Sequence, residues 1–209
     1  AVYALIRDDR PLLSSILAKA RAAMPAEARQ AMEDDWLVPD AAPAGGARLS
    51  LTAEERRYVR ENPVFTASNE KNWPPFNFNI NGVPQGYSVD YMNMLAEMTG
   101  LEVRYVIGPE WDDFEHMLRE ETLDVLMNMA ITPARESYTI FTPPYATLVH
   151  GVVFRDGELT PPTLETLGGR VVAVPKGFFT ERVIREHYPD IKVLTPPDAL
   201  GCLQAVATG

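Results

Sequence analysis

The strongest constraint on the fold is an alternation of strand-like and helix-like apolar patterns between residues 64 and 129. Strands are predicted at Val64–Ser68, Val103–Ile107 and Asp124–Met129. Between them, Ser88–Thr99 and Glu110–Glu121 carry apolar residues at helical spacing. Strands that alternate with helices through short connections form right-handed βαβ units around a parallel sheet. The sequence therefore predicts an α/β fold.

A second set of the same kind follows residue 150. Its predicted elements are three strands and two helices: Val149–Phe154, Arg170–Val174 and Ile191–Leu194 as strands, with helices at Thr180–Tyr188 and from Asp198 onward. We therefore expect two α/β units, at residues 51–150 and 151–209.

A helical region precedes both units. Two helices are predicted at 11–24 and 26–36, and residues 38–50 have the small, Pro- and Gly-rich composition of a linker. Thr52 followed by Glu55 is a capping box that predicts a helix start. The predicted domains are residues 1–37, the linker at 38–50, and the two units at 51–150 and 151–209.

Composition excludes several classes of protein. The net charge of −10 disfavours a protein that tracks nucleic-acid phosphates or an anionic membrane. No apolar run approaches the roughly 20 residues of a membrane helix. Cys202 is the only cysteine, the three histidines are far apart, and common catalytic and nucleotide-binding motifs are absent. We therefore expect no metal, no cofactor and no catalytic residues.

Ligands of open α/β sheets bind beyond the carboxyl ends of the strands, where three loops are expected: 69–79, 128–135 and 175–180. In the first, a stiff Pro-Pro pair can hold Trp73 as a flat apolar wall, although the loop can also be a rigid turn whose aromatics fill the core. The third ends in Thr180, which we expect to cap a helix.

The second loop combines a helix start at Thr132 with Arg135. Free N–H groups at a helix start attract anions, and an arginine can hold a carboxylate through two parallel hydrogen bonds. The pair is thus a candidate carboxylate receptor. The alternative is that Thr132 is an ordinary N-cap and that Arg135 forms a surface ion pair.

Several motifs in order resemble the family 3 extracellular solute-binding proteins, which are two-lobed binders of polar amino acids. The motifs are Asn72-Trp-Pro-Pro-Phe, Gly86-Tyr-Ser-Val-Asp-Tyr-Met-Asn-Met-Leu, Asp124-Val-Leu, Thr132-Pro-Ala-Arg, Phe141-Thr-Pro-Pro-Tyr and Leu167-Gly-Gly-Arg-Val-Val-Ala-Val-Pro-Lys-Gly. The resemblance covers about residues 50–209. It implies a type II periplasmic-binding-protein-like clamshell with parallel-sheet lobes, the second lobe being truncated at the C-terminus.

The resemblance also implies roles for single residues. Trp73 matches the aromatic residue that stacks on the ligand, and Glu70 matches a polar contact beside it. Arg135 matches the residue that grips an amino acid's α-carboxylate from an open cleft, and Thr180 matches a hydroxyl of the second lobe. We place Asn128 and Thr132 on the same wall as Trp73 and Arg135.

The helix before the first strand is typical of versions repeated in tandem in bacterial sensor kinases and diguanylate-cyclase receptors. Residues 1–37 resemble the closing strand and helices of a preceding copy, which we expect to pack apart from the main module. The implied function is a periplasmic, non-catalytic sensing domain. It would bind a small carboxylate-bearing, amino-acid-like solute and signal by lobe closure, with membrane attachment outside this segment. The alternatives are an enzyme on the same fold, similar to cyclohexadienyl dehydratase, and a soluble transporter-associated binding protein.

Overall fold

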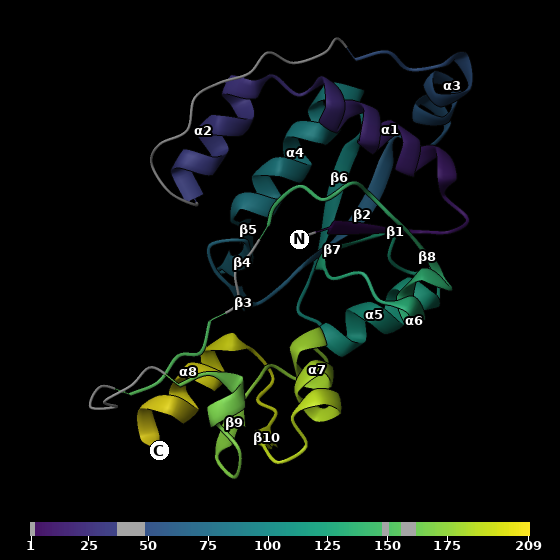
Figure 1. Ribbon diagram of the computed structural model, residues 1–209. Helices are drawn as coiled ribbons and strands as arrows, with labels where there is room; N and C mark the ends of the chain where they lie inside the picture. Colours follow the sequence, from purple (N-terminus) through teal and green to yellow (C-terminus); the bar gives the residue numbers. More distant parts are fainter. Residues whose placement is uncertain (1–2, 37–48, 148–150, 156–161) are drawn as a thin grey trace. The chain divides into compact units, whose positions relative to one another are not determined.

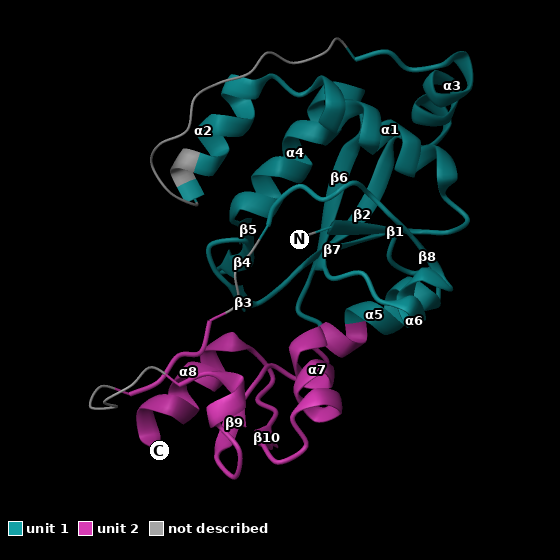
Figure 2. Ribbon diagram, viewed as in Figure 1, with its two compact units in different colours: residues 1–109, 114–147 teal, residues 110–113, 148–209 magenta. Residues whose placement is uncertain are grey.

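The computed structural model describes residues 3–36, 49–147, 151–155 and 162–209, as drawn in Figure 1. The chain divides into two compact units (Figure 2). Residues 1–109 and 114–147 form the first unit, and residues 110–113 and 148–209 form the second. Most of the predicted linker at 38–50 lies outside the described residues.

A five-stranded sheet forms the centre of the first unit, with the strand order β6-β2-β7-β1-β8. Its strands are β1 (Tyr3–Arg7), β2 (Val64–Asn69), β6 (Glu102–Ile107), β7 (Val125–Met129) and β8 (Thr139–Phe141). β2 runs parallel to both β6 and β7, as the alternating sequence pattern predicts. The α/β fold expected from the sequence is thus present in this unit.

The helices of the first unit are α1 (Pro11–Ala23), α2 (Ala26–Trp36), α3 (Ala53–Glu61), α4 (Tyr87–Thr99) and α6 (Pro133–Glu136). The last six residues of α5 (Trp111–Arg119) also belong to this unit. α4 buries Val89, Met92 and Leu95 on one face and ends at Gly100, whose φ of 74° suits a glycine C-cap. At the start of α3, Thr52 and Glu55 form the predicted capping box.

β1 occupies a different place from the one we expected for residues 1–37. Instead of packing apart from the main module, it lies between β7 and β8 and pairs with both in the antiparallel direction. Leu5 and Ile6 are fully buried there. α1 then packs against α3 and α4 (Figure 1). The segment is therefore part of the first unit, and its origin as the tail of a preceding copy stays a prediction.

A small sheet of β3 (Asn72–Trp73), β4 (Asn77–Ile80) and β5 (Val83–Gln85) follows β2 and begins within the loop expected at 69–79. It leads into α4 through Gly86, which has a φ of 114°. A Cβ atom at this position would lie 2.5 Å from the carbonyl oxygen of Phe76. Glycine is therefore required at the junction, on both conformational and steric grounds.

The second unit has a smaller core, made of Leu167, Val174, Ile184 and Ile191. Its elements are the 3-10 helix η1 (Leu164–Thr166), β9 (Val171–Ala173), α7 (Phe179–His187), β10 (Lys192–Leu194) and α8 (Ala199–Thr208). β9 and β10 are parallel. The predicted strand at Val149–Phe154 is wrong for residues 151–154, which form neither strand nor helix.

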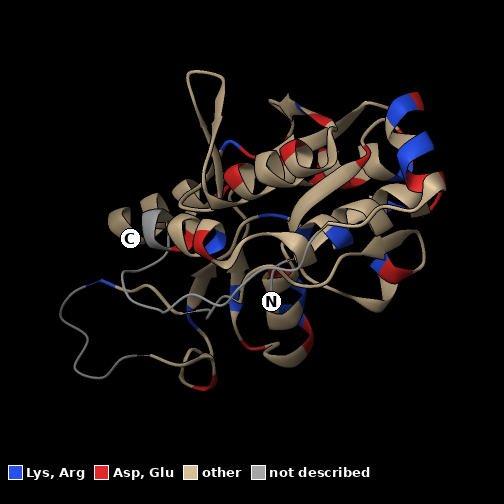
Figure 3. Ribbon diagram, turned by 90° about the horizontal axis from the view of Figure 1, so that it is seen from above, with Lys and Arg blue, Asp and Glu red and all other residues tan. Residues whose placement is uncertain are grey.

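Acidic and basic positions are interspersed along the helices (Figure 3). Several form ion pairs one helical turn apart, such as Arg185 with Glu181 at 3.0 Å. Such exposed pairs add little to stability because solvent screens them. Among the described residues, no helix has both the length and the apolar character needed to cross a membrane.

Candidate functional site

Polar side chains gather where β2 and β7 end side by side. Glu70 directly follows β2, and Asn128 is the penultimate residue of β7. Because parallel strands present their carboxyl ends at the same sheet edge, the two side chains meet there. The Asn128 Nδ2 atom donates to Glu70 Oε1 at 3.3 Å. Asn128 has a φ of 66°, in the left-handed region that asparagine tolerates better than most residues.

Two hydroxyl groups complete this cluster. The Ser88 hydroxyl, from the first turn of α4, donates to Asn128 Oδ1 at 2.5 Å. The Tyr145 hydroxyl donates to the same oxygen at 2.7 Å and lies 3.2 Å from Ser88 Oγ. We call Glu70, Asn128, Ser88 and Tyr145 the polar cluster. With its carbonyl oxygen occupied by two donors, Asn128 must present its amide N–H groups to Glu70.

Glu70 supplies the carboxyl of the polar cluster, and its pKa is strongly shifted. Its side chain is buried, and burial raises its pKa to about 8, although the hydrogen bond from Asn128 acts in the opposite direction. Burial disfavours the charged form of a carboxyl unless donors or cations compensate. Such a group becomes ionised readily when a cationic or hydrogen-bond-donating ligand approaches it.

Asparagine side chains hold the backbone on either side of Glu70. Asn77 Oδ1 accepts from Asn69 Nδ2 at 2.7 Å and from the Glu70 backbone N–H at 3.3 Å. Asn79 Nδ2 donates to the Glu70 carbonyl oxygen at 3.2 Å. These bonds tie β2 to β4 and fix the direction in which the Glu70 side chain leaves the sheet.

Aromatic rings lie beside the polar cluster. Tyr145 stacks on Tyr91 with ring centroids 4.7 Å apart, and Tyr87 stacks on Tyr145 at 6.3 Å. Phe76 packs edge-on against Tyr87. Trp73 is half-buried in β3, with its ring 5.1 Å from that of Phe76. The rings form an apolar border beside the polar cluster. Trp73 lies at one end of this border and is more exposed than the other rings.

Thr132 and Arg135 lie in the first unit as well, but their side chains are engaged within it. Thr132 caps α6 by accepting from the Arg135 backbone N–H at 3.4 Å, the ordinary N-cap that we considered as the alternative. The Arg135 guanidinium donates to Glu115 Oε2 at 3.2 Å and to the Ala130 carbonyl oxygen at 3.3 Å. Its side chain is only 8% exposed. This placement differs from the open-cleft position that the resemblance implied.

Thr180 lies in the second unit, and its expected position as an N-cap is wrong. The N-cap of α7 is Phe178, so Thr180 is the second residue of the helix. The Gly177 backbone N–H just before the helix donates instead to Glu181 Oε2 at 2.9 Å. Thr180 itself is half-buried.

Sequence reasoning missed Ser88 and Tyr145. Ser88 is the first residue of the helix predicted at 88–99, and Tyr145 ends a motif of the family resemblance, but neither is among the predicted site residues. Their sequence distance from Asn128, 40 residues for Ser88 and 17 for Tyr145, gives no local signal. Among the described residues, no group of three or more acidic, histidine or cysteine side chains could hold a metal ion.

Comparison with known proteins gives one family match. The model of the bacterial extracellular solute-binding proteins, family 3, matches residues 65–192. Among curated proteins, the virulence sensor protein BvgS of Bordetella bronchiseptica is 23% identical over 205 residues. This match covers 98% of the present chain but only 17% of BvgS. The chain therefore spans about a sixth of the length of this relative.

Solved structures show the same fold. The ancestral amino acid-binding protein AncCDT-1, a precursor of cyclohexadienyl dehydratase, is 26% identical, with a TM-score of 0.66 over 74% of this chain and 70% of that chain. The periplasmic VFT2 domain of BvgS from Bordetella pertussis is 24% identical, with a TM-score of 0.67 over 77% of this chain and 68% of that chain. Both place the chain among α/β solute-binding folds.

Proposed function

Since this chain belongs to family 3 of the bacterial extracellular solute-binding proteins, we propose that it is a ligand-sensing domain for a small amino-acid-like solute. The observation that carries the proposal is the polar cluster at the carboxyl ends of β2 and β7. A solute with a cationic group and a carboxylate would find in it a carboxyl, an amide and two hydroxyl groups. Trp73 beside them would cover an apolar part of the solute.

Glu70 is the group that we assign to the cationic end of the solute. Its carboxyl is buried and accepts a hydrogen bond from the Asn128 side chain. An ammonium or guanidinium group would provide charge and further hydrogen bonds, and would lower the pKa that burial has raised. Charge-assisted hydrogen bonds of this kind are roughly twice as strong as those between neutral groups.

We propose further that the domain works outside the cytoplasm, as part of a longer sensor protein. BvgS, which matches nearly the whole chain, is named a virulence sensor protein, and its structurally similar VFT2 domain is named periplasmic. In this proposal the ligand binds one arrangement of the two units more tightly than others and so shifts their populations. Closure of the units on the ligand would be the signal.

Calorimetric titration with the twenty standard amino acids, one at a time, tests the proposal. We expect at least one to bind, and we expect Glu70→Gln to weaken that binding roughly 10- to 100-fold, the value of one charged hydrogen bond. Glu102→Gln is the matched control, because Glu102 is an exposed glutamate at the start of β6 and should leave affinity unchanged. Absence of binding by every amino acid, or equal affinities of the two variants, would contradict the proposal.

A further inference from the structure

The segment of β1, α1 and α2, residues 3–36, meets the rest of the first unit across a surface built like an interface between two proteins. Its centre is the pairing of β1. Leu5 is in register with Leu126 on one side and with Phe141 on the other. The Ala4 backbone N–H adds a bond to Thr142 Oγ1 at 3.1 Å. β1 thereby covers the facing edges of β7 and β8, whose backbone groups would otherwise lack these partners.

The helices of the segment extend this apolar centre. α1 buries Leu13, Ile16 and Leu17, each at most 1% exposed, and packs against α3 and α4. α2 also packs against α4, and the Trp36 indole N–H at its end donates to Asp90 Oδ2 at 2.7 Å. Burial of apolar side chains such as these is the main source of affinity between separate protein surfaces.

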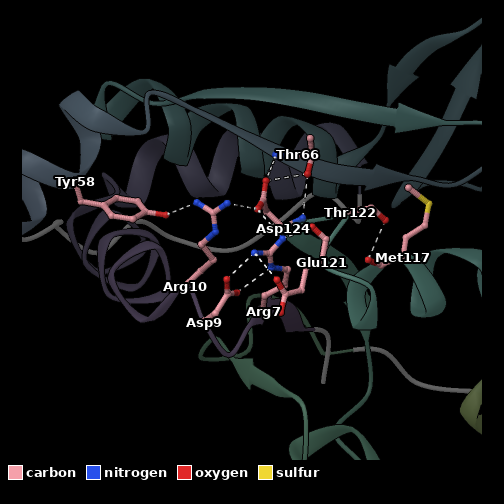
Figure 4. Close-up of polar contacts among 9 residues, drawn as sticks. All are labelled: Arg7, Asp9, Arg10, Tyr58, Thr66, Met117, Glu121, Thr122 and Asp124. Atoms are coloured by element: carbon pink, nitrogen blue, oxygen red, sulfur yellow. Dashed lines mark hydrogen bonds and ion pairs between the residues drawn. The ribbon is translucent and has the colours of Figure 1, made fainter.

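Charge complementarity surrounds the apolar centre, with the cations on the segment. Arg10 pairs with Asp124 at 3.3 Å and donates to the Tyr58 hydroxyl at 3.2 Å (Figure 4). Asp124 is held in place by the Thr66 hydroxyl and backbone N–H, both at 2.9 Å. Arg7, beside it, pairs with Asp9 of the segment and donates to the Glu121 carbonyl oxygen (Figure 4).

A second charged contact lies at the other end of α1. Lys19 Nζ is 2.6 Å from Glu55 Oε2, and the Ser15 hydroxyl donates to the other oxygen of Glu55 at 2.5 Å. Further along, Arg21 donates to the Pro144 carbonyl oxygen at 2.7 Å. An apolar centre with a polar, charge-matched border is the usual composition of a specific protein–protein interface.

We propose that the surface formed by β7, β8, α3 and α4 is a docking site for a strand–helix–helix segment, and that it accepts residues 3–36 of a second copy of this chain in place of its own. Except for the pair of Arg7 with Asp9 and the bonds of Thr66 to Asp124, the contacts described above join the segment to the rest of the unit, so they form equally well whether the segment belongs to the same chain or to another. Exchange of an identical element between copies needs no new contacts. The proposal is independent of the nature of any ligand.

Docking of the segment also constrains the strand end that carries Asn128 of the polar cluster. Tyr3 of β1 is in register with Met129, the neighbour of Asn128. The docked segment therefore holds the end of β7 from which the Asn128 side chain reaches Glu70. A copy that donates its segment would fix this strand end in the copy that receives it, which gives two copies a physical connection.

A cleavage experiment on the full chain tests the proposal. A protease recognition sequence is inserted between Ala44 and Gly45, in one preparation with an N-terminal affinity tag and in another labelled with ¹⁵N. Both are cleaved, mixed and incubated just below the melting temperature. We expect each cleaved protein to stay assembled in size-exclusion chromatography, and the tagged segment to bring down ¹⁵N-labelled residues 45–209, identified by mass. Separation of the fragments after cleavage would overturn the proposal, and so would retention of unlabelled partners only.

Two arginine variants test whether the charged contacts contribute to docking. Arg10→Met removes the contacts to Asp124 and Tyr58, and we expect it to speed exchange about tenfold, as the loss of one charged hydrogen bond predicts. Arg57→Met is the matched control, because the ion-pair partner of Arg57 is Glu61 on the same helix. If the two variants exchange at the same rate, the charged border contributes nothing to docking and the proposed surface is wrong.

Discussion

Glu70 illustrates how position in the sheet controls the ionisation of a single residue. Glu70 is buried directly after the end of β2, where Asn128 donates to its carboxyl. Burial there raises the pKa to about 8 from an ordinary value of 4.5. The folded protein therefore binds a proton at pH values where the unfolded chain has lost it.

This difference predicts a pH dependence of stability. Because the folded pKa lies above the unfolded one, the contribution of Glu70 is fully present below pH 4.5 and is lost as the pH rises through 8. A shift of this size corresponds to on the order of 5 kcal/mol of unfolding free energy. We expect denaturant titrations of the wild type to show this loss between pH 5 and 8.5, and Glu70→Gln, which cannot ionise, to lack it. A parallel pH dependence in the two proteins would contradict the assignment.

Arg135 and Arg119 offer a second comparison at the residue scale, because both contact Glu115. Arg135 is 8% exposed at 3.2 Å from this carboxylate, and Arg119 is 52% exposed at 3.0 Å. Burial raises the pKa of Glu115, but the Tyr138 hydroxyl and the charge of Arg135 hold it below its ordinary value. The pKa of Glu115 is thus lowered by Tyr138 and the buried Arg135 more than by the exposed Arg119.

We therefore expect Arg135→Ala to lower the unfolding free energy by roughly 2 kcal/mol, because it removes the buried cation and leaves the partly buried Glu115 carboxylate paired only with the exposed Arg119. Arg119→Ala should cost less than about 1 kcal/mol, as exposed ion pairs do. Urea denaturation at pH 7 measures both. If Arg135→Ala leaves stability unchanged and instead reduces amino-acid affinity, the role implied by the family resemblance is restored.

At the scale of elements, the junction between the β3–β5 sheet and α4 decides where Ser88 lies. Gly86 lets the chain pass within contact of the Phe76 backbone and begin the helix at Tyr87. The Ser88 and Tyr87 backbone N–H groups donate to the Phe76 and Pro75 carbonyl oxygens, both at 2.9 Å. The polar cluster thus depends on a backbone contact as much as on its own side chains.

Gly86→Ala is expected to lower the unfolding free energy by about 3 kcal/mol, because it adds both a positive-φ penalty and a clash with backbone. Gly82→Ala is the matched control. Gly82 also has a positive φ, of 78°, but an added Cβ would meet nothing within 4 Å, so the cost should be about 1 kcal/mol. Equal melting temperatures for the two variants would show that the close approach to Phe76 is unimportant.

At the scale of the whole molecule, the two units differ in how much apolar surface they bury. The first has a central sheet with fully buried Leu5, Leu126 and Met127. In the second, Val171 of β9 is 64% exposed and Leu194 of β10 is 47% exposed. Local stability follows the number of buried apolar contacts around a segment.

We therefore expect amide hydrogen exchange to be much faster in β9 and β10 than in β2 and β7. Mass spectrometry of peptides after exchange at pH 7 measures this directly. Protection in β9 equal to that in β7 would mean that the small core of the second unit is as stable as the central sheet.

The sequence by itself determined the local elements and the family. Apolar periodicity over a few residues located α4, β2, β6 and β7 to within one or two residues, and the α3 capping box was read from Thr52 and Glu55 alone. These signals are local because a helix or strand is selected by the spacing of neighbouring residues.

Only the tertiary structure decided the place of β1, the polar cluster and the partners of Arg135. β1 pairs with strands more than a hundred residues away, and Ser88 and Tyr145 reach Asn128 from separate elements. Arg135 turns to Glu115 on another helix rather than outward. Such contacts join residues whose sequence spacing carries no information about them, because strand order and buried polar pairing are selected by the energy of the whole packed unit.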